Sequence, residues 1–116
     1  MVEELGGIRV FVSDTQVADD GDAVQLIAQA HYEHDAEWVA LAADSLGDDF
    51  FELRTGRAGA IAQKFVNYRM GLAVVGDISD KLAASKPLRD WVRESNLGRS
   101  VWFVDELSML AERLRG

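Results

Sequence analysis

The chain has 116 residues, of which 48% are hydrophobic and 28% charged, as expected of a single domain over residues 1–116 with a core of its own. Its formal net charge of −8 argues against a general nucleic-acid-binding protein, and the lack of cysteine excludes thiol catalysis and cysteine-ligated metals. No apolar run approaches the ~18 residues of a membrane span and the N-terminus does not have the pattern of a signal peptide, so a cytoplasmic protein is expected.

Two elements are predicted before residue 35. Apolar residues alternate with others over residues 8–12, which predicts a strand, and Gly6-Gly7 before it predicts a hairpin with the short stretch 2–5. The acidic stretch 19–22 then favours a helix start, because carboxylates there cap free N–H groups and complement the helix dipole.

The rest of the chain alternates between strand and helix patterns. The predicted elements are a buried strand over 37–43, an amphipathic helix over 58–66, a strand over 72–75, a helix over 85–98 capped by Ser85, a strand over 101–104 and a final helix capped by Asp105. This order predicts an α/β domain with a mixed, mostly parallel sheet of about five strands. An antiparallel hairpin forms one edge, and about four helices cover the sheet.

The charges are distributed unevenly along the chain. Residues 1–53 carry 13 acidic side chains and a single basic one, Arg9, whereas residues 54–116 carry 11 basic and seven acidic side chains. Two interpretations are open: the acidic half forms solvated helices and loops, or the molecule is polar and docks a partner with its second half.

The stretch FFELRTGRAGAIAQKFVNY, residues 50–68, joins two adjacent aromatic residues to a Thr-Gly step at a helix start. Together with the element order, this step resembles the STAS domain, the fold of bacterial anti-sigma factor antagonists. In those proteins a Ser-Gly-Leu-Gly type step opens the helix, and a partner kinase that is also the anti-sigma factor phosphorylates the serine. The resemblance implies that Thr55 lies where the regulated hydroxyl is, with threonine in place of serine.

A longer pattern is similar to an uncharacterised bacterial family, domain of unknown function 4180. It covers DFFELRTGRAGAIAQKFVNYRMGLAVVGDIS, residues 49–79, and PLRDWVRESNLGR, residues 87–99. The family has no settled activity, so this resemblance implies membership and no catalytic residues.

Two interpretations of Thr55 are open. The hydroxyl caps the helix, which stabilises by about 1 kcal/mol, or it is phosphorylated or contacts a partner. A phosphate at a helix N-terminus is favoured by the dipole and the free N–H groups, and Arg54 and Arg57 would pair with it or with an acidic group of a partner. Gly56 and Gly59 allow close backbone approach. We therefore expect a non-enzymatic, regulatory protein-binding surface here that needs no cofactor.

Phe50 and Phe51 belong to the same expected surface. Adjacent residues in a regular element point in different directions, so one is expected to anchor the loop in the core and the other to be exposed for a partner. The alternative is that an irregular loop buries both.

Four aspartates, Asp14, Asp44, Asp77 and Asp105, each follow a predicted strand. Ligands of open α/β sheets bind at the carboxyl ends of strands, and converging carboxylates hold Mg²⁺. The alternative function is therefore a small enzyme or a ligand- or Mg²⁺-binding domain that uses Asp44, Asp77 and Asp105. The simpler interpretation is that each aspartate caps a helix.

His31 and His34 are three residues apart, a spacing that metal ligands also use, but no second ligand pair occurs elsewhere, so no metal site is predicted. His31 is expected to extend the apolar stripe of its helix. The expected partner is a protein, with neither nucleic acid nor a membrane involved. A homodimer that pairs through a sheet edge or the aromatic loop is a third hypothesis.

Overall fold

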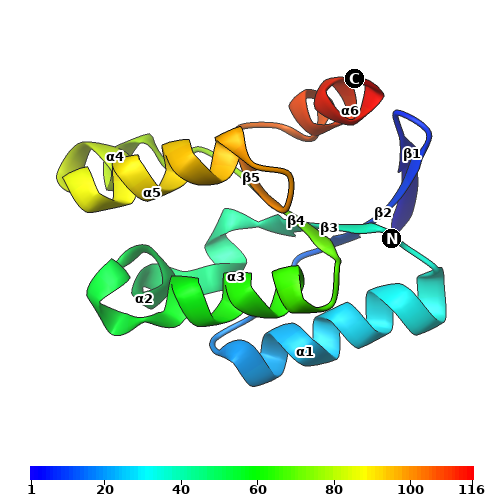
Figure 1. The fold of residues 1–116 in the computed structure, drawn as a ribbon, viewed down its shortest axis with the longest axis horizontal. Coiled ribbons are helices and arrows are strands. Elements are labelled where there is room, and N and C mark those ends of the chain that lie inside the picture. The colour runs from blue at the N-terminus through cyan, green and yellow to red at the C-terminus, as the bar shows by residue number, and fades with distance from the viewer.

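A five-stranded sheet, whose strands lie side by side in the order of the chain, forms the centre of the computed structural model, which describes residues 1–116 (Figure 1). The strands are β1 (Val2–Leu5), β2 (Ile8–Ser13), β3 (Trp38–Ala42), β4 (Gly71–Val75) and β5 (Val101–Val104). β1 runs antiparallel to β2, and every other neighbouring pair is parallel. The predicted mixed sheet with an antiparallel edge hairpin is confirmed.

The hairpin between β1 and β2 depends on its two glycines. Gly6 and Gly7 have φ angles of +59° and +83°, the left-handed conformations that a tight two-residue turn needs. Gly6 also leaves room for the C-terminal helix, because a Cβ there would come within 2.6 Å of the backbone nitrogen of Arg115. The turn is therefore fixed both by its own geometry and by the helix packed against it.

Six α-helices and three shorter helical turns connect and follow the strands. The α-helices are α1 (Asp20–Ala28), α2 (Gly47–Phe51), α3 (Arg57–Asn67), α4 (Ser79–Ala84), α5 (Lys86–Leu97) and α6 (Leu107–Arg115). The shorter turns are η1 (Gln29–Glu33), which is π-helical, and the 3-10 turns η2 (Ala43–Leu46) and η3 (Leu53–Thr55). About four helices were expected, and the two extra ones, α2 and α4, are too short to show a periodic pattern. None of these helices has the length and apolar character that crossing a bilayer requires.

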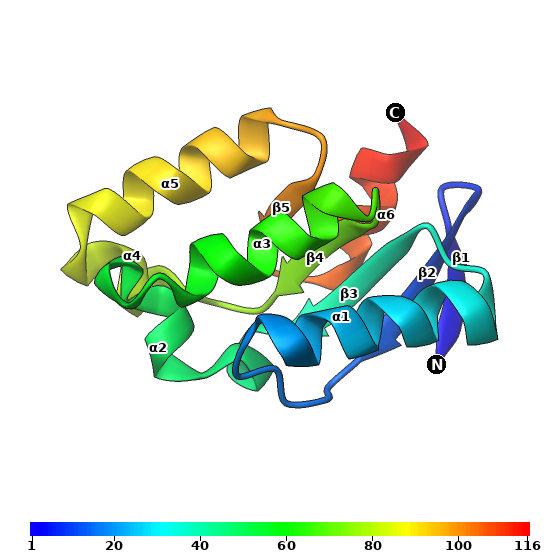
Figure 2. The ribbon, with the colours of Figure 1, turned by 60° about the horizontal axis from the view of Figure 1, so that its bottom comes forward.

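Helices α1, α3 and α5 lie side by side on one face of the sheet (Figure 2). Each parallel connection leads to the next strand along the sheet, always in the same direction. Because such connections are right-handed, their helices lie on the same face of the sheet. The interface between these helices and the sheet contains a cluster of 24 buried residues, the main core of the protein.

The opposite face of the sheet is covered by α6, which follows the last strand. Leu110 is the fully buried residue of this helix and packs with Val10, Ala40 and Ala73. At one end of this face the rings of Trp38 and Trp102 meet at a tilt of 33°, with centroids 4.4 Å apart. This second core has six buried residues, of which Leu110 is the one that α6 contributes.

The predicted helix caps are partly confirmed. The hydroxyl of Ser85 accepts a hydrogen bond from the N–H of Leu88 at 3.2 Å and caps α5 as expected. The expectation that Asp105 caps the last helix is wrong: α6 begins one residue later, after Glu106, without a side-chain cap. The acidic stretch before α1 does supply a cap, because Asp19 accepts from the N–H of Asp22 at 2.9 Å.

Candidate functional site

Thr55 lies at the surface where α2 ends and α3 begins, and its hydroxyl connects the two helices. Its Oγ1 is 2.7 Å from the carbonyl oxygen of Asp49 and 2.8 Å from that of Glu52, and it donates its one proton to either. The same oxygen accepts the N–H of Arg57, the first residue of α3, at 3.2 Å. The expectation that Thr55 is the N-cap of α3 is therefore wrong: Gly56 is in that position, without a side-chain cap. The Thr55 hydroxyl instead links the first N–H of α3 to carbonyl oxygens at the end of α2.

The two glycines of this segment have different roles. Gly56 has a φ of +78° immediately before α3, a conformation that strains other residues. A Cβ at either glycine would meet nothing within 4 Å, so the close backbone approach expected at Gly56 and Gly59 is not seen. What is open at this point is the start of α3, where the N–H groups of Ala58 and Gly59 donate no hydrogen bond within the protein.

The two arginines beside Thr55 point to different partners. Arg54 has an 88% exposed side chain and pairs with Glu52 at 3.0 Å. Arg57 is half-buried, and its Nη1 donates to the carbonyl oxygen of Ala18 at 2.7 Å, which fixes the loop before α1. Only Arg54 is therefore free to turn towards an anion at Thr55 without breaking a contact between distant segments.

Phe50 and Phe51 are both buried, with exposed fractions of 0% and 6%. They lie in α2, with ring centroids 5.0 Å apart, and the Phe50 ring also meets the Trp91 ring of α5 at 5.9 Å. The ammonium group of Lys81 covers Phe51 at 5.1 Å. The interpretation that both are buried is therefore confirmed, and the one in which one of them is exposed is wrong. The segment that buries them is a single-turn helix and not an irregular loop.

The strand-end aspartates are not gathered into one group of three. No three His, Asp or Glu side chains of the protein come close enough together to hold a metal ion, so the convergence of Asp44, Asp77 and Asp105 is not seen. Asp77 instead accepts the N–H of Ser79 at 2.9 Å. That backbone hydrogen bond, and then one from the Ser79 hydroxyl, hold the pKa of Asp77 below its ordinary value.

The two histidines, His31 and His34, lie in different environments. The ring of His34 stacks on Phe11 with centroids 4.5 Å apart, whereas His31 is exposed. His31 therefore does not continue the apolar stripe of α1. It lies in the π-helical turn η1 and lines a cavity that sequence analysis did not predict.

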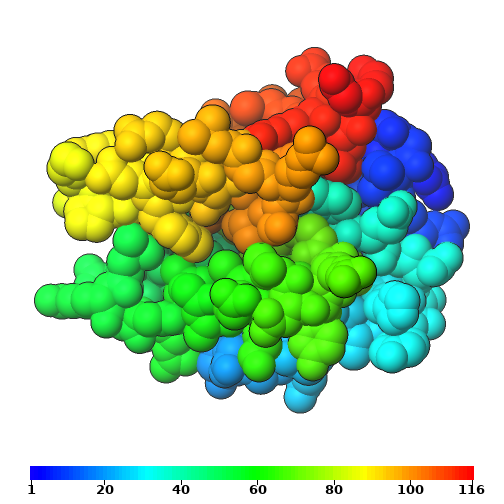
Figure 3. Space-filling model, in the orientation of Figure 1, coloured from blue at the N-terminus to red at the C-terminus, as the bar shows by residue number.

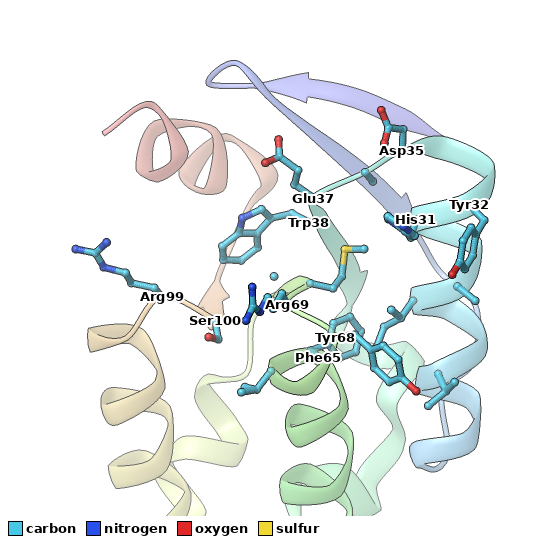
Figure 4. A pocket seen from close by; sticks show the side chains of 17 residues that line it. His31, Tyr32, Asp35, Glu37, Trp38, Phe65, Tyr68, Arg69, Arg99 and Ser100 are labelled. Atoms are coloured by element: carbon cyan, nitrogen blue, oxygen red, sulfur yellow. The ribbon is translucent and has the colours of Figure 1, made fainter.

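This cavity, of about 780 Å³, lies at the amino ends of β3, β4 and β5, at the end of α3 opposite to Thr55. Figure 3 shows it as a hollow where the surfaces of α3, of the segment before β3 and of the segment before β5 meet. Its walls are formed by 17 residues, which include Phe65, Met70, Trp38, Tyr32, Tyr68, His31, Asp35, Glu37, Arg69, Arg99 and Ser100 (Figure 4).

The backbone around the cavity is irregular at three places. Asp35 and Arg69 have φ angles of +52° and +55°, and they are the two non-glycine residues of the chain with positive φ. Both line the cavity, as does part of the π-helical turn η1. Such conformations gather at functional sites, so the cavity is a second candidate site.

The charged and aromatic side chains of the cavity have few partners. Neither Arg69 nor Arg99 forms an ion pair or a side-chain hydrogen bond. Tyr32 and Tyr68 are 83% and 57% exposed, unusually high fractions for large aromatic residues. The sequence contains one signal for this cavity. Helices commonly end at a glycine, but α3 is followed by NYRM, so another residue must take the left-handed position there.

Comparison with known proteins gives a family and no function. A family model described as Domain of unknown function (DUF4180) matches residues 6–114. No curated protein and no solved structure matches the chain. The expected family resemblance is therefore confirmed, whereas the likeness to STAS domains stays a prediction.

Proposed function

The chain belongs to this family of domains of unknown function, and on that premise we propose that it is a non-enzymatic regulatory module that binds a protein partner through its surface at residues 50–59. Phosphorylation of Thr55 would switch that binding. The observation that supports the proposal is the position of the Thr55 hydroxyl, which is exposed and yet connects α2 to α3. The same proposal places the protein in the cytoplasm.

A phosphate on Thr55 would change the bonding of this surface without entering the core. A kinase would transfer the γ-phosphoryl group of a nucleoside triphosphate to Oγ1. The bond from that phosphorus to the nucleoside diphosphate would break, the diphosphate would leave, and the hydroxyl proton would pass to a base of the kinase. Oγ1 then no longer donates to Asp49 or Glu52, and about two negative charges are added beside those acidic residues. The nearest favourable groups are the free N–H groups of Ala58 and Gly59 at the start of α3.

The surface that rearranges would be the exposed turn between the two helices. Glu52, Arg54 and Gly56 are exposed there, and Arg54 needs only to leave Glu52 to pair with the phosphate. Phe50 and Phe51 remain buried and hold the end of α2 in place. A partner that contacts this turn would therefore meet a different shape and charge in each state, while the fold stays the same.

The test compares the wild type with Thr55→Glu and Thr55→Ser. Each tagged protein is recovered from its native host, its intact mass is measured, and its co-purifying proteins are identified. We expect a partner that Thr55→Ser retains and Thr55→Glu loses, and a phosphate on the wild-type Thr55. The matched control is Thr15→Glu at the other threonine of the chain, which is also exposed. Identical partners for all four proteins, with no phosphate on Thr55, would refute the proposal.

A further inference from the structure

We propose that the cavity at the amino ends of β3–β5 binds a small organic anion, a carboxylate or similar group attached to a flat apolar body. The cavity lies at the opposite end of α3 from Thr55, so this proposal does not depend on the proposed switch. Its volume of about 780 Å³ is within the range of roughly 300–1,000 Å³ that small-molecule sites occupy.

The anionic group is indicated by the unpaired arginines. The protein carries a net charge of −8, yet Arg69 and Arg99 line this cavity without any acidic partner. In Figure 4 the guanidinium of Arg69 lies beside Ser100 and below Trp38, whereas the carboxylates of Asp35 and Glu37 point away from it. Arg69 is therefore the group that would bind a carboxylate, and a guanidinium binds one with two parallel hydrogen bonds.

The apolar body is indicated by the floor and one wall of the cavity. Phe65 and Met70 are buried at its base, and Trp38 forms part of its side. The indole of Trp38 lies directly over Gly71, where a Cβ would collide with the ring, and it meets the Trp102 ring at a tilt of 33°. These contacts hold the indole in one orientation, so it forms a fixed apolar wall of the cavity beside which a planar group fits.

The backbone of Arg69 is the observation that points to function. The N–H of Arg69 donates to the carbonyl of Val66 at 3.1 Å and that of Met70 to the carbonyl of Phe65 at 3.0 Å. This is the Schellman ending of α3, in which the position of Arg69 adopts the left-handed conformation and is usually glycine or asparagine. An arginine there keeps a strained backbone, and the charge that it brings to the cavity accounts for its presence.

The test is an amide NMR titration of the whole protein with indole-3-acetate, a carboxylate on a planar apolar ring. Its uncharged analogue, indole-3-acetamide, measures the contribution of the ring alone. We expect saturable shifts at residues 35–38 and 68–71 with both probes, and at least roughly tenfold weaker binding of the amide. Equal affinities of the two probes, or no saturable shift at roughly 10 mM indole-3-acetate, would overturn the proposal.

Arg69→Asn is the decisive variant, because asparagine tolerates the left-handed conformation and the fold is expected to persist. We expect it to bind indole-3-acetate as weakly as the amide and to bind the amide as the wild type does. The matched control, Arg93→Asn, removes an exposed arginine of α5 outside the cavity and is expected to change neither affinity. Equal losses in both variants would mean a nonspecific charge effect and would contradict the proposal.

One further outcome identifies a protein-docking surface in place of a small-molecule site. In that case the shifts are confined to the exposed residues Tyr32, Val66 and Tyr68 and do not saturate, while Met70 and Gly71 are unaffected. That result would overturn the small-anion proposal and leave the Thr55 test untouched.

Discussion

Thr55 illustrates how much of a local structure one hydroxyl stabilises. Its oxygen accepts one N–H and its proton reaches two carbonyl oxygens, so it serves the end of one helix and the start of the next. We expect Thr55→Val, which keeps the shape and removes the hydroxyl, to lower the free energy of unfolding by about 1–2 kcal/mol in denaturant titrations. Thr55→Ser is the control and is expected to keep most of that stability. An unchanged stability of Thr55→Val would show that the hydroxyl is structurally dispensable.

At Arg69, unlike at Thr55, a substitution is expected to increase the stability of the protein. Glycine has no steric penalty at a φ of +55°, so we expect Arg69→Gly to raise the free energy of unfolding by about 1 kcal/mol. The matched control is Arg99→Gly at the other cavity arginine, whose φ is not positive. There glycine only increases the freedom of the unfolded chain, so stability is expected to fall. A loss of stability in both variants would show that the Arg69 backbone is not strained.

Two carboxylates predict how stability depends on pH. The N–H of Ser79 lowers the pKa of Asp77, and the hydrogen bond from Lys86, at 2.8 Å, lowers the pKa of Asp90, each from an ordinary value of 3.8. A carboxylate whose pKa is lower in the folded state stabilises the protein fully at pH values above its pKa in the unfolded state. That stabilisation is lost as the pH falls through its pKa in the folded state. We therefore expect stability to decline below about pH 4 and the decline to be shallower in Asp77→Asn. Parallel pH curves for the two proteins would contradict this.

At the scale of elements, α6 is the helix that covers the face of the sheet opposite to α1, α3 and α5. It is the helix on its face of the sheet, and Leu110 is its fully buried residue. We expect Leu110→Ala to lower the free energy of unfolding by about 3 kcal/mol, the usual cost of such a truncation in a core. Its neighbour Met109 is 43% exposed, so Met109→Ala serves as the control and is expected to change stability by less than about 0.5 kcal/mol. Similar losses in both would mean that α6 packs differently.

The elements also show which features could be predicted from the sequence. Alternation and apolar runs were sufficient for β2 to β5, the Gly-Gly turn for β1, and the long stripes for α1, α3, α5 and α6. The one-turn helices α2 and α4 have too few residues for a period. The burial of both Phe50 and Phe51 was therefore one of two open interpretations, and the helical turn that causes it could not be foreseen. The cavity was missed because it is formed by the ends of separate elements, and no local pattern records their meeting in space.

At the scale of the whole molecule, the two outer strands differ in how their edges are protected. The side-chain oxygen of Asn96 accepts the outward N–H of Phe103 in β5 at 2.7 Å, so α5 covers this edge. At the other edge, β1 has only four residues, two of them glutamates, and both features discourage pairing with another chain. These features bear on the homodimer hypothesis, which stays a prediction.

Light scattering at several protein concentrations tests the protection of the β5 edge. We expect Asn96→Ala to raise the average mass relative to the wild type as concentration increases, because the N–H of Phe103 is then free to pair with a second chain. Asn67→Ala is the control. Asn67 accepts a hydrogen bond from Gln63 at 2.8 Å on the surface of α3, and it belongs to neither edge strand. If the wild type already has the mass of a dimer, the homodimer hypothesis is confirmed and edge protection by Asn96 is not what limits assembly.

The order of the strands has a consequence for how the protein is made. Since β1 to β5 lie in the sheet as they do in the chain, each strand leaving the ribosome pairs with one that has already emerged, and no slot has to be kept open for a later strand. The growing sheet has one advancing edge. In the finished sheet that edge is β5, and Asn96 accepts the N–H of Phe103 there. Asn96 leaves the ribosome a few residues before Phe103. The sheet is therefore able to assemble in step with translation, and its last edge is protected as soon as β5 is in place.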